Sequence, residues 1–536
     1  MSYALLWIET IALALIWMAA MLAVAAHFRS RVWFALAVLG IVLVPLVPIG
    51  GTAVAIAIAR LMGSFYPNPI LPYSVSQTII LVVGMAIILR RAQRPALTTT
   101  GLAAAGWPRG RLLLTLLMAF ALWIMTAWNI ELAARAQVAA VRQEAGAMML
   151  SVVPPVANDA QNAAFIYEKA FRYLDADPDL KKNKDKNILN QEKPNIAGPA
   201  VAQFLTRHIN TLSLIYQAVA LPDCYFEHNY LHPDFSMIMP ELGKLRQVAR
   251  LLQLHRQYET ARGNVGSAIN DTRAMFRLAD HTGRSPLLIA ALVSIAIDGM
   301  AVKNAEEVLS TLTEAQQVIR LGIDDPDRIA RMMRRAMTCE EAFGIATFSD
   351  LTDGRVDIAA LVGTPESNGP TPAFAGGAFV RLCFVGNDLD DYRRTMVSYR
   401  QLLARPFYEV QPELREIDDQ THRPRGFMTA LLLPALHSDI TTSARMTAQL
   451  ECARLAALAT DYRIAKGQLP PTLESLMPEY LTEIPLDPFD GKPLRTKLTA
   501  EKLVIYSIGP DLKDDGGTEF DNKTKTGDIT VTLKVK

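Results

Sequence analysis

The densest group of metal-ligand side chains in this chain occurs near two prolines and comprises Cys224, Glu227, His228, His232 and Asp234. Zinc binds cysteine, histidine and carboxylate side chains, so this composition raises the hypothesis of a zinc site. On a helix, the spacing of His228 and His232 would place both rings on one face. Because Pro222 and Pro233 disfavour a helix here, we expect polar loop residues, with zinc as the alternative.

Two other groups of polar residues have structural interpretations. His255 extends the apolar face of a predicted helix, and we expect it to be a hydrogen-bonded core histidine. An exposed helix surface, with Glu340 and Glu341 as ion-pair partners, is expected for the arginines Arg328, Arg331, Arg334 and Arg335. The chain contains no G-x-S-x-G, P-loop or H-E-x-x-H motif, so we assign no catalytic or cofactor-binding residue.

Cysteine spacing does not define a disulfide framework. The four cysteines lie far apart in the sequence, without a C-x-x-C pair: Cys224, Cys339, Cys383 and Cys452. In an oxidising compartment they could pair in several ways, which sequence does not distinguish. Buried free thiols are the alternative.

The C-terminal residues 441–536 combine helix, turn and strand signals. A helix is predicted to end at Gly467, a short helix to span 472–480, and prolines to impose extended chain over 485–493. Residues 503–508 alternate like a strand, an Asp/Gly-rich loop follows, and a last strand is predicted over 529–535. These signals predict a small α+β module.

Three motifs carry a resemblance to a known family: Gly467-Gln468-Leu469-Pro470, Pro485-Leu486-Asp487-Pro488-Phe489-Asp490-Gly491-Lys492-Pro493 and Tyr506-Ser507-Ile508-Gly509-Pro510-Asp511. The module resembles the C-terminal half of the major pseudopilin of type II secretion, in which the loop after the central strand binds calcium. The resemblance implies calcium as a cofactor and, as oxygen ligands, Asp511, Asp514, Asp515 and Asp528. An acidic turn without an ion is the alternative.

The resemblance covers only residues 441–536, and this limits what it implies. A pseudopilin begins with a processed leader whose apolar helix runs directly into the globular head. Here the module follows 440 residues of other chain, so we do not expect polymerisation as a pilin. Residues 155–536 also resemble a family of bacterial multi-pass membrane proteins of the cell envelope, which implies a location but no activity.

Composition divides the chain at about residue 130. Residues 1–130 contain all six tryptophans, eight arginines, no lysine and a single acid, Glu9. Four apolar stretches approach the ~20 residues that cross a bilayer, at 4–26, 32–59, 73–89 and 112–130. Residues 131–536 hold 46 basic and 52 acidic residues, which offers no basic surface for nucleic acid.

The arginines of this first region also predict its orientation. Seven of the eight lie in the loops after the first and third spans. The positive-inside rule places those loops in the cytoplasm, and the N-terminus and everything after residue 130 outside it. The sequence therefore predicts a multi-pass protein of the bacterial inner membrane, with the lipid bilayer and other envelope proteins as partners.

Residues 131–440 are predicted to be helices joined by polar loops, in a hairpin or solenoid-like arrangement. Apolar stripes at helical spacing include Tyr167, Ala170, Phe171 and Leu174, then Leu245, Val248 and Leu252, and then Val265, Ile269, Met275 and Phe276. Ser285-Pro286 is expected to cap and open another helix. A Gly/Pro-rich loop is expected over 346–380. The fold class is mainly α: a four-helix transmembrane region, a helical body and the α+β module.

Three functions are consistent with this organisation. An interaction or scaffold role in the envelope is favoured, because helical hairpins and a compact tail occur without a catalytic motif. The first alternative is an envelope enzyme with its site under loop 346–380. The second is a secretion-system component that uses the pseudopilin-like module for docking.

Overall fold

The computed structural model describes residues 139–155, 158–182, 187–191, 194–230, 239–314, 325, 327–352, 387–421, 433, 436–521 and 523–534. The four predicted transmembrane spans and Glu9 lie outside the described residues. Contacts divide the chain into one unit of Met1–Ala140, Phe348–Tyr392 and Arg423–Leu432, and a second unit of Val141–Thr347, Arg393–His422 and Leu433–Lys536. The layers and sites below belong to the second unit.

The described chain is mainly helical with one small sheet, as the sequence predicts. After a helical segment at 139–152, the elements are η1 (Asp159–Gln161), α6 (Ala164–Ala176), α7 (Pro178–Lys182), η2 (Ile188–Asn190), α8 (Pro199–Arg207), α9 (Ile209–Ala220), α10 (Pro240–Ala261), α11 (Val265–Thr282), α12 (Leu288–Leu309), α14 (Arg328–Thr352), α17 (Asn387–Leu402), α18 (Phe407–Thr421) and α20 (Leu436–Lys466). The C-terminal elements are η3 (Leu473–Leu476), β1 (Arg495–Leu498), β2 (Lys502–Ser507) and β3 (Ile529–Lys534).

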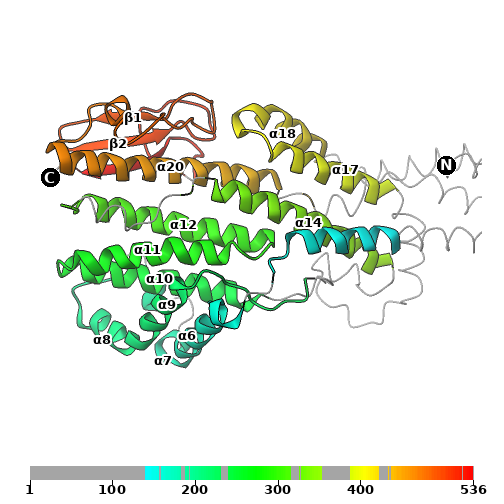
Figure 1. Cartoon of the computed structure of the whole chain (residues 1–536), viewed down its shortest axis with the longest axis horizontal. Helices are drawn as coiled ribbons and strands as arrows, with labels where there is room; N and C mark the ends of the chain where they lie inside the picture. Colours follow the sequence, from blue (N-terminus) through cyan, green and yellow to red (C-terminus); the bar gives the residue numbers. More distant parts are fainter. Residues whose placement is uncertain are drawn as a thin grey trace, which may run out of the picture. The chain divides into compact units, whose positions relative to one another are not determined.

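α10, α11, α12 and α20 lie side by side in this order (Figure 1). α10 packs on α11, α11 on α12, and α12 on α20, while α6 packs on α9 and α9 contacts α11. The predicted stripe of α6 is buried, as are Leu245, Val248 and Leu252 of α10. Gly263, at φ +76°, makes the turn between α10 and α11, and the Asn264 side chain accepts a hydrogen bond from Ser267 N to cap α11.

α8 and α9 meet at His208, whose buried ring lies 3.2 Å from Asp177 and Thr211. Two local predictions differ from the structure. α12 begins at Leu288, with Leu287 as its N-cap residue, rather than at Ser285-Pro286, and the Ser285 hydroxyl lies 3.4 Å from the Tyr230 hydroxyl. Residues 346–352 of the predicted loop belong to α14, and 353–380 lie outside the described residues.

One helix of the described chain, Leu288–Leu309, is long and apolar enough to cross a membrane. This helix is α12, and 67% of its apolar window is buried inside the protein. It lies between α11 and α20, so its apolar character follows from its place in the core.

The C-terminal sheet is antiparallel with strand order β1-β2-β3. Its edge strand β1 was not expected from the sequence, and η3 is shorter than the predicted helix at 472–480. α20 packs on β2 and β3 and ends before Gly467, at φ +75°, as predicted. Since α20 runs across residue 440, the helical body and the C-terminal module share this helix.

Candidate functional site

The predicted metal cluster around Cys224 is only partly described. His228 Nε2 lies 2.7 Å from Glu241 Oε1 of α10, and Cys224 is a buried free thiol. His232 and Asp234 lie outside the described residues. Among the residues that the structure describes, no three His, Cys, Asp or Glu side chains are grouped so that they could hold a metal ion.

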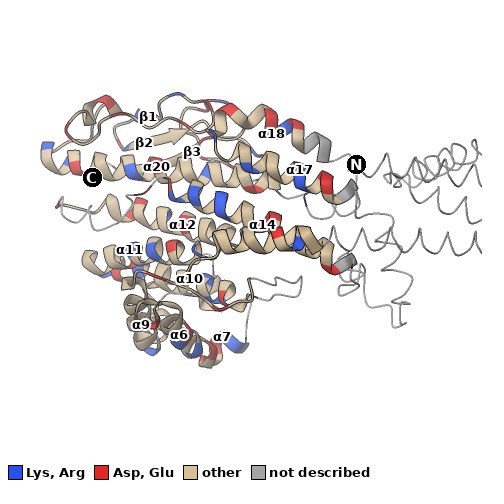
Figure 2. Cartoon of the chain, turned by 45° about the vertical axis from the view of Figure 1, so that its right-hand side comes forward, with Lys and Arg blue, Asp and Glu red and all other residues tan. Residues whose placement is uncertain are grey.

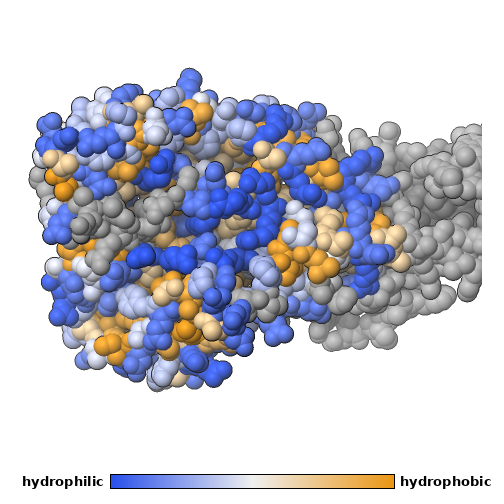
Figure 3. All heavy atoms as spheres, in the orientation of Figure 1, coloured by the Kyte–Doolittle hydropathy of each residue, from blue (hydrophilic) through white to orange (hydrophobic). Residues whose placement is uncertain are grey.

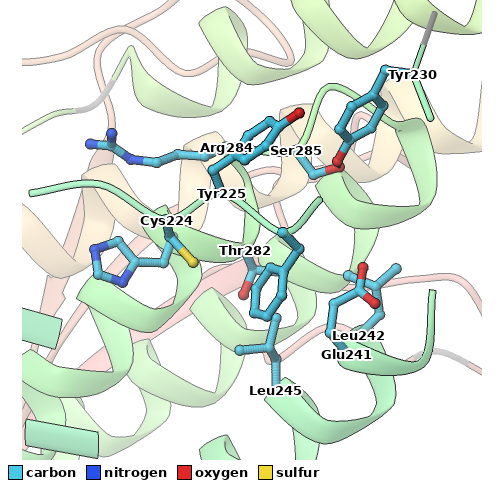
Figure 4. Close-up of a pocket in the computed structure, with 11 residues that line it drawn as sticks. Cys224, Tyr225, Tyr230, Glu241, Leu242, Leu245, Thr282, Arg284 and Ser285 are labelled. Atoms are coloured by element: carbon cyan, nitrogen blue, oxygen red, sulfur yellow. The ribbon is translucent and has the colours of Figure 1, made fainter. Parts of the chain in front are cut away.

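Cys224 borders a small cavity between α10, α11 and the chain after α9 (Figure 4). Its volume is about 10 Å³, room for one water molecule at most. Burial raises the pKa of the Cys224 thiol, which makes it a poor nucleophile. His281 also borders the cavity, and burial, reinforced by the Arg277 charge, lowers its pKa to about 4. This cavity is therefore part of the core and does not admit a substrate.

The other described cysteines are core residues too. Cys339 and Cys452 are buried free thiols, and burial raises the pKa of both. Cys383 lies outside the described residues. For the three described cysteines, the structure thus favours the free-thiol alternative.

In the arginine cluster of α14, Arg331 and Arg334 are exposed as predicted, whereas Arg328 and Arg335 are half-buried. Arg328 donates to Asp298, which is fully buried in α12, and Arg335 donates to the Gly283 carbonyl oxygen. Glu341 pairs with Arg400 of α17 at 2.7 Å, not with the predicted arginines. Arg328 and Arg335 differ from the prediction because they face neighbouring elements that provide these acceptors.

The predicted calcium ligands lie in the loop after β2 and at the start of β3. Asp511 accepts hydrogen bonds from the amides of Lys513 and Gly527, both at 3.2 Å. The Asp514 carboxylate accepts from Gly516 N at 3.0 Å and from the Tyr506 hydroxyl at 3.2 Å, and it lies 3.3 Å from Arg495 Nε.

Asp528 is the buried member of this group. It is fully buried and accepts from Asp515 N at 3.3 Å and Gly517 N at 2.7 Å, while the Asp515 side chain is exposed. Burial raises the pKa of Asp528, and the two amides oppose that effect. Three of the four carboxylates thus organise the loop's own backbone, and calcium binding stays a prediction.

The structural role of Asp487, the aspartate of the Pro-Leu-Asp-Pro motif, was not evident from the sequence. Its fully buried carboxylate accepts from Phe489 N at 2.9 Å, Ile508 N at 2.9 Å and Ser507 Oγ at 2.8 Å. It also lies 3.2 Å from Arg495 Nη1. Asp487 therefore joins the proline-rich loop to the end of β2, and the motif is structural.

A second group of polar residues lies in the helical body, away from the C-terminal module. It forms where α9, α10 and α11 meet. The Asp271 carboxylate of α11 is fully buried and accepts from the Tyr216 hydroxyl of α9. It also lies 2.8 Å from His255 Nδ1 of α10, which must donate to it. Burial raises the pKa of Asp271, against the opposing effects of His255 and Tyr216. Hydrogen bonding of His255 is confirmed.

His255 is not a fully enclosed core residue, however. Its side chain is 18% exposed and borders an open groove of about 540 Å³. The rest of the groove is lined by one face of α9: Ile209, Leu212, Ser213, Tyr216, Gln217 and Ala220. The i, i+3 and i, i+4 spacing of these residues was visible in the sequence, but their position beside His255 depends on the packing of both α9 and α10 against α11.

Comparison of the chain with protein-family models, with curated proteins and with solved structures finds no match. The structure by itself defines the class: a stacked helical body joined through one long helix to a small α+β module.

Proposed function

We propose that this chain is a membrane-anchored protein of the bacterial cell envelope whose helical body and C-terminal module act together as one binding platform outside the cytoplasm. The observation that carries the proposal is the position of α20. One part of its surface packs on α12 of the body, and another packs on β2 and β3 of the sheet. A partner that binds the module is therefore coupled directly to the body and, through the chain before residue 139, to the predicted anchor.

Hydrogen bonds reinforce this junction at the end of α12. Arg463 of α20 donates to the carbonyl oxygens of Leu309 at 3.1 Å and Leu312 at 2.9 Å. The last carbonyls of a helix lack intrahelical partners, and a cation there also interacts favourably with the helix dipole. Arg463 thus joins the C-terminal end of α12 to α20.

The outer edge of β3 is joined to α12 as well. Thr532 N donates to Glu306 Oε1 at 2.9 Å, and Lys534 N donates to Ser310 Oγ at 3.2 Å. Unpaired strand edges invite association with other chains, so α12 protects this edge. β1 forms the other edge of the sheet, where Leu498 is 44% exposed.

The surface character of the described residues supports a role in an aqueous compartment. Basic and acidic residues are interspersed over the helices and the sheet (Figure 2). On the face in Figure 3, hydrophilic residues dominate and hydrophobic residues occur in smaller groups between them. Such a mixed surface suits specific protein contacts more than insertion into lipid.

Two experiments test the proposal. Reporters active on only one side of the membrane are fused after residues 31, 100 and 140, and we expect an extracytoplasmic signal after 140 alone. A photo-cross-linking amino acid in place of Leu498 is expected to capture a discrete envelope partner in cells. The same amino acid in place of Ile209, outside the module, is the control. A cytoplasmic signal after 140, or no Leu498-specific adduct, would contradict the platform role.

A secretion-associated role is the second candidate, because a long helix packed on a three-stranded antiparallel sheet and followed by a Gly/Asp loop accords with the pseudopilin resemblance. Deleting the chain should then retain secreted proteins inside the cell, and normal secretion would refute this role. The enzyme hypothesis rests on loop 346–380, of which 353–380 lie outside the described residues.

A further inference from the structure

The elements from η1 to α9 form a layer beside α10 and α11, which we call the N-terminal layer (Figure 1). Within it α6 packs on α9, and it meets the other helices where α9 contacts α11 and where α8 and η2 contact α10. Polar contacts contribute to this joint. Arg277 of α11 donates to the carbonyl oxygens of Val219 at 3.4 Å and Leu221 at 3.1 Å, at the end of α9.

His281 of α11 lies at the centre of this joint. Its Nε2 is 3.1 Å from the carbonyl oxygen of Leu221, and its Nδ1 is 3.1 Å from the hydroxyl of Tyr167 on α6. Because a carbonyl oxygen only accepts, Nε2 carries the proton of the neutral ring, and Nδ1 accepts a hydrogen bond from the tyrosine. The neutral ring therefore joins α11 both to α6 and to the end of α9.

Protonation of His281 opposes this arrangement in two ways. A proton on Nδ1 would point at the Tyr167 oxygen, so the tyrosine, which is 0% exposed, would have to turn its own proton away from its acceptor. The new charge would also lie on α11 between Arg277 and Arg284. These two arginines already share one acid, Asp280, at 3.3 Å and 3.6 Å.

The electrostatics of His281 agree with this geometry. Burial, reinforced by the charges of the two arginines against that of Asp280, lowers the pKa of the ring to about 4. The titratable or charged groups that border the ring or its cavity are Tyr167 on α6, Asp223 and Cys224 after α9, Glu241 on α10, and Arg277, Asp280 and Arg284 on α11. Asp223 and Glu241 are already paired, with Arg284 and His228 respectively.

We propose that His281 is a pH-sensitive switch whose protonation releases the N-terminal layer from α11, while α10, α11, α12 and α20 stay packed on one another. These four helices keep their contacts because the buried apolar residues of α11 and α12, which do not titrate, make them. The switch is independent of the binding platform, which consists of α12, α20 and the sheet.

A second histidine at the joint responds differently to acid. His255 of α10 lies 2.8 Å from Asp271, which also accepts from Tyr216 of α9. Burial lowers the pKa of His255, but Asp271 outweighs burial and raises it overall, so this contact is fully stabilising below pH 6.5. Burial also raises the pKa of Asp271, whose protonation favours the closed layer and reduces the effect of His281 in acid.

Hydrogen exchange of the full chain in detergent, at pH 6.5 and pH 4 and corrected for the intrinsic effect of pH on amides, tests the switch. A pKa of 6.5 in the open layer and about 4 in the closed one raises the opening constant by up to about 100-fold. Since Asp271 reduces this effect, we expect peptides of α6 and α9 to open at least about tenfold more at pH 4, and peptides of α12 less than about tenfold. A rise below tenfold in α6 and α9, or of tenfold or more in α12, overturns the proposal.

Variants assign the response to this ring. Glutamine does not titrate, so His281→Gln should show less than about one third of the wild-type rise in α6 and α9, whatever its exchange rate at pH 6.5. A larger share assigns the response to other groups and overturns the switch. His437→Gln is the matched control in α20, outside the N-terminal layer, and should show the wild-type rise. Equal loss of the response in both variants also overturns the assignment.

Discussion

Replacing Asp487 with alanine should locally unfold the C-terminal sheet more than any comparable change of a surface acid. The substitution removes the acceptor of two backbone amides, Phe489 N and Ile508 N, and of the Ser507 hydroxyl, all within a fully buried site. Alanine supplies no acceptor, and the cavity that it leaves is too enclosed for bulk water to replace all three bonds.

The expected cost follows from these bonds. Each buried donor that loses a charged acceptor costs on the order of 1–3 kcal/mol, and partial relaxation reduces the sum, so we expect about 4 kcal/mol. Arg495 contributes less to the loss, because it keeps contacts of 2.5 Å to Asp490 and 3.3 Å to Asp514. Asp490→Asn is the matched control: Asp490 accepts only Lys492 N and Arg495, and we expect about 1 kcal/mol.

Hydrogen exchange of the full-length protein, followed by mass spectrometry of peptides that cover β2, measures the local opening free energy. A loss of about 4 kcal/mol raises the exchange rate of the Ile508 region about 1,000-fold, whereas Asp490→Asn raises it about fivefold. Peptides from α10 and α11 report whether the effect stays local. A rise below about tenfold for Asp487→Ala would show that this carboxylate does not hold the loop to the sheet.

Three further predictions concern acid, backbone strain and calcium. His281 has a pKa of about 4 in the folded protein against an ordinary value of 6.5, so the folded state binds fewer protons, and stability should fall by about 3 kcal/mol as pH decreases from 6.5 to 4. Urea midpoints measured across this range should show a smaller decrease for His281→Gln, and equal slopes would argue against the assignment. Gly491→Ala places a Cβ 2.8 Å from the Tyr408 ring at φ +68°, so it should lower the free energy of unfolding by about 2 kcal/mol or more. Gly467→Ala, at φ +75°, meets no atom within 4 Å and should lower it by about 1 kcal/mol. Equal melting temperatures of the two variants would count against the steric argument. If the Asp-rich loop binds calcium, the melting temperature of the wild type should be higher in calcium than in chelator, and that of Asp514→Ala should be the same in both. An unchanged melting temperature of the wild type would refute calcium binding by this loop.

Local patterns predicted several of the helices because their causes are local. The stripe that includes Tyr167 and Leu174 has the period of an α-helix, and α6 buries it. Gly263 and Gly467 mark helix ends through backbone conformations that other residues adopt at a cost, and Asn264 caps α11 with its side chain. Ser285-Pro286 has the same kind of local signal, yet α12 begins three residues after Ser285, at Leu288.

Candidate sites were less predictable, because they depend on contacts between distant segments. The sequence suggested hydrogen bonding for His255, but Asp271 and Tyr216 become its neighbours only through the packing of α9, α10 and α11. The Pro-Leu-Asp-Pro motif was recognised as a pattern, yet the role of Asp487 required the position of Ile508 on the next strand. Strand β1 was missed because four residues, Arg495–Leu498, carry little periodicity.

By itself, the sequence determined the division into an apolar, arginine-bearing region and a longer helical region with an α+β tail, since composition and periodicity are properties of neighbouring residues. Only the tertiary structure decided that the tail and the body share α20, that apolar α12 is a core helix, and that the buried Asp271 of α11 lies against His255 of α10. Each of these features arises from side chains far apart in the chain, whose burial and pairing depend on how the helices pack.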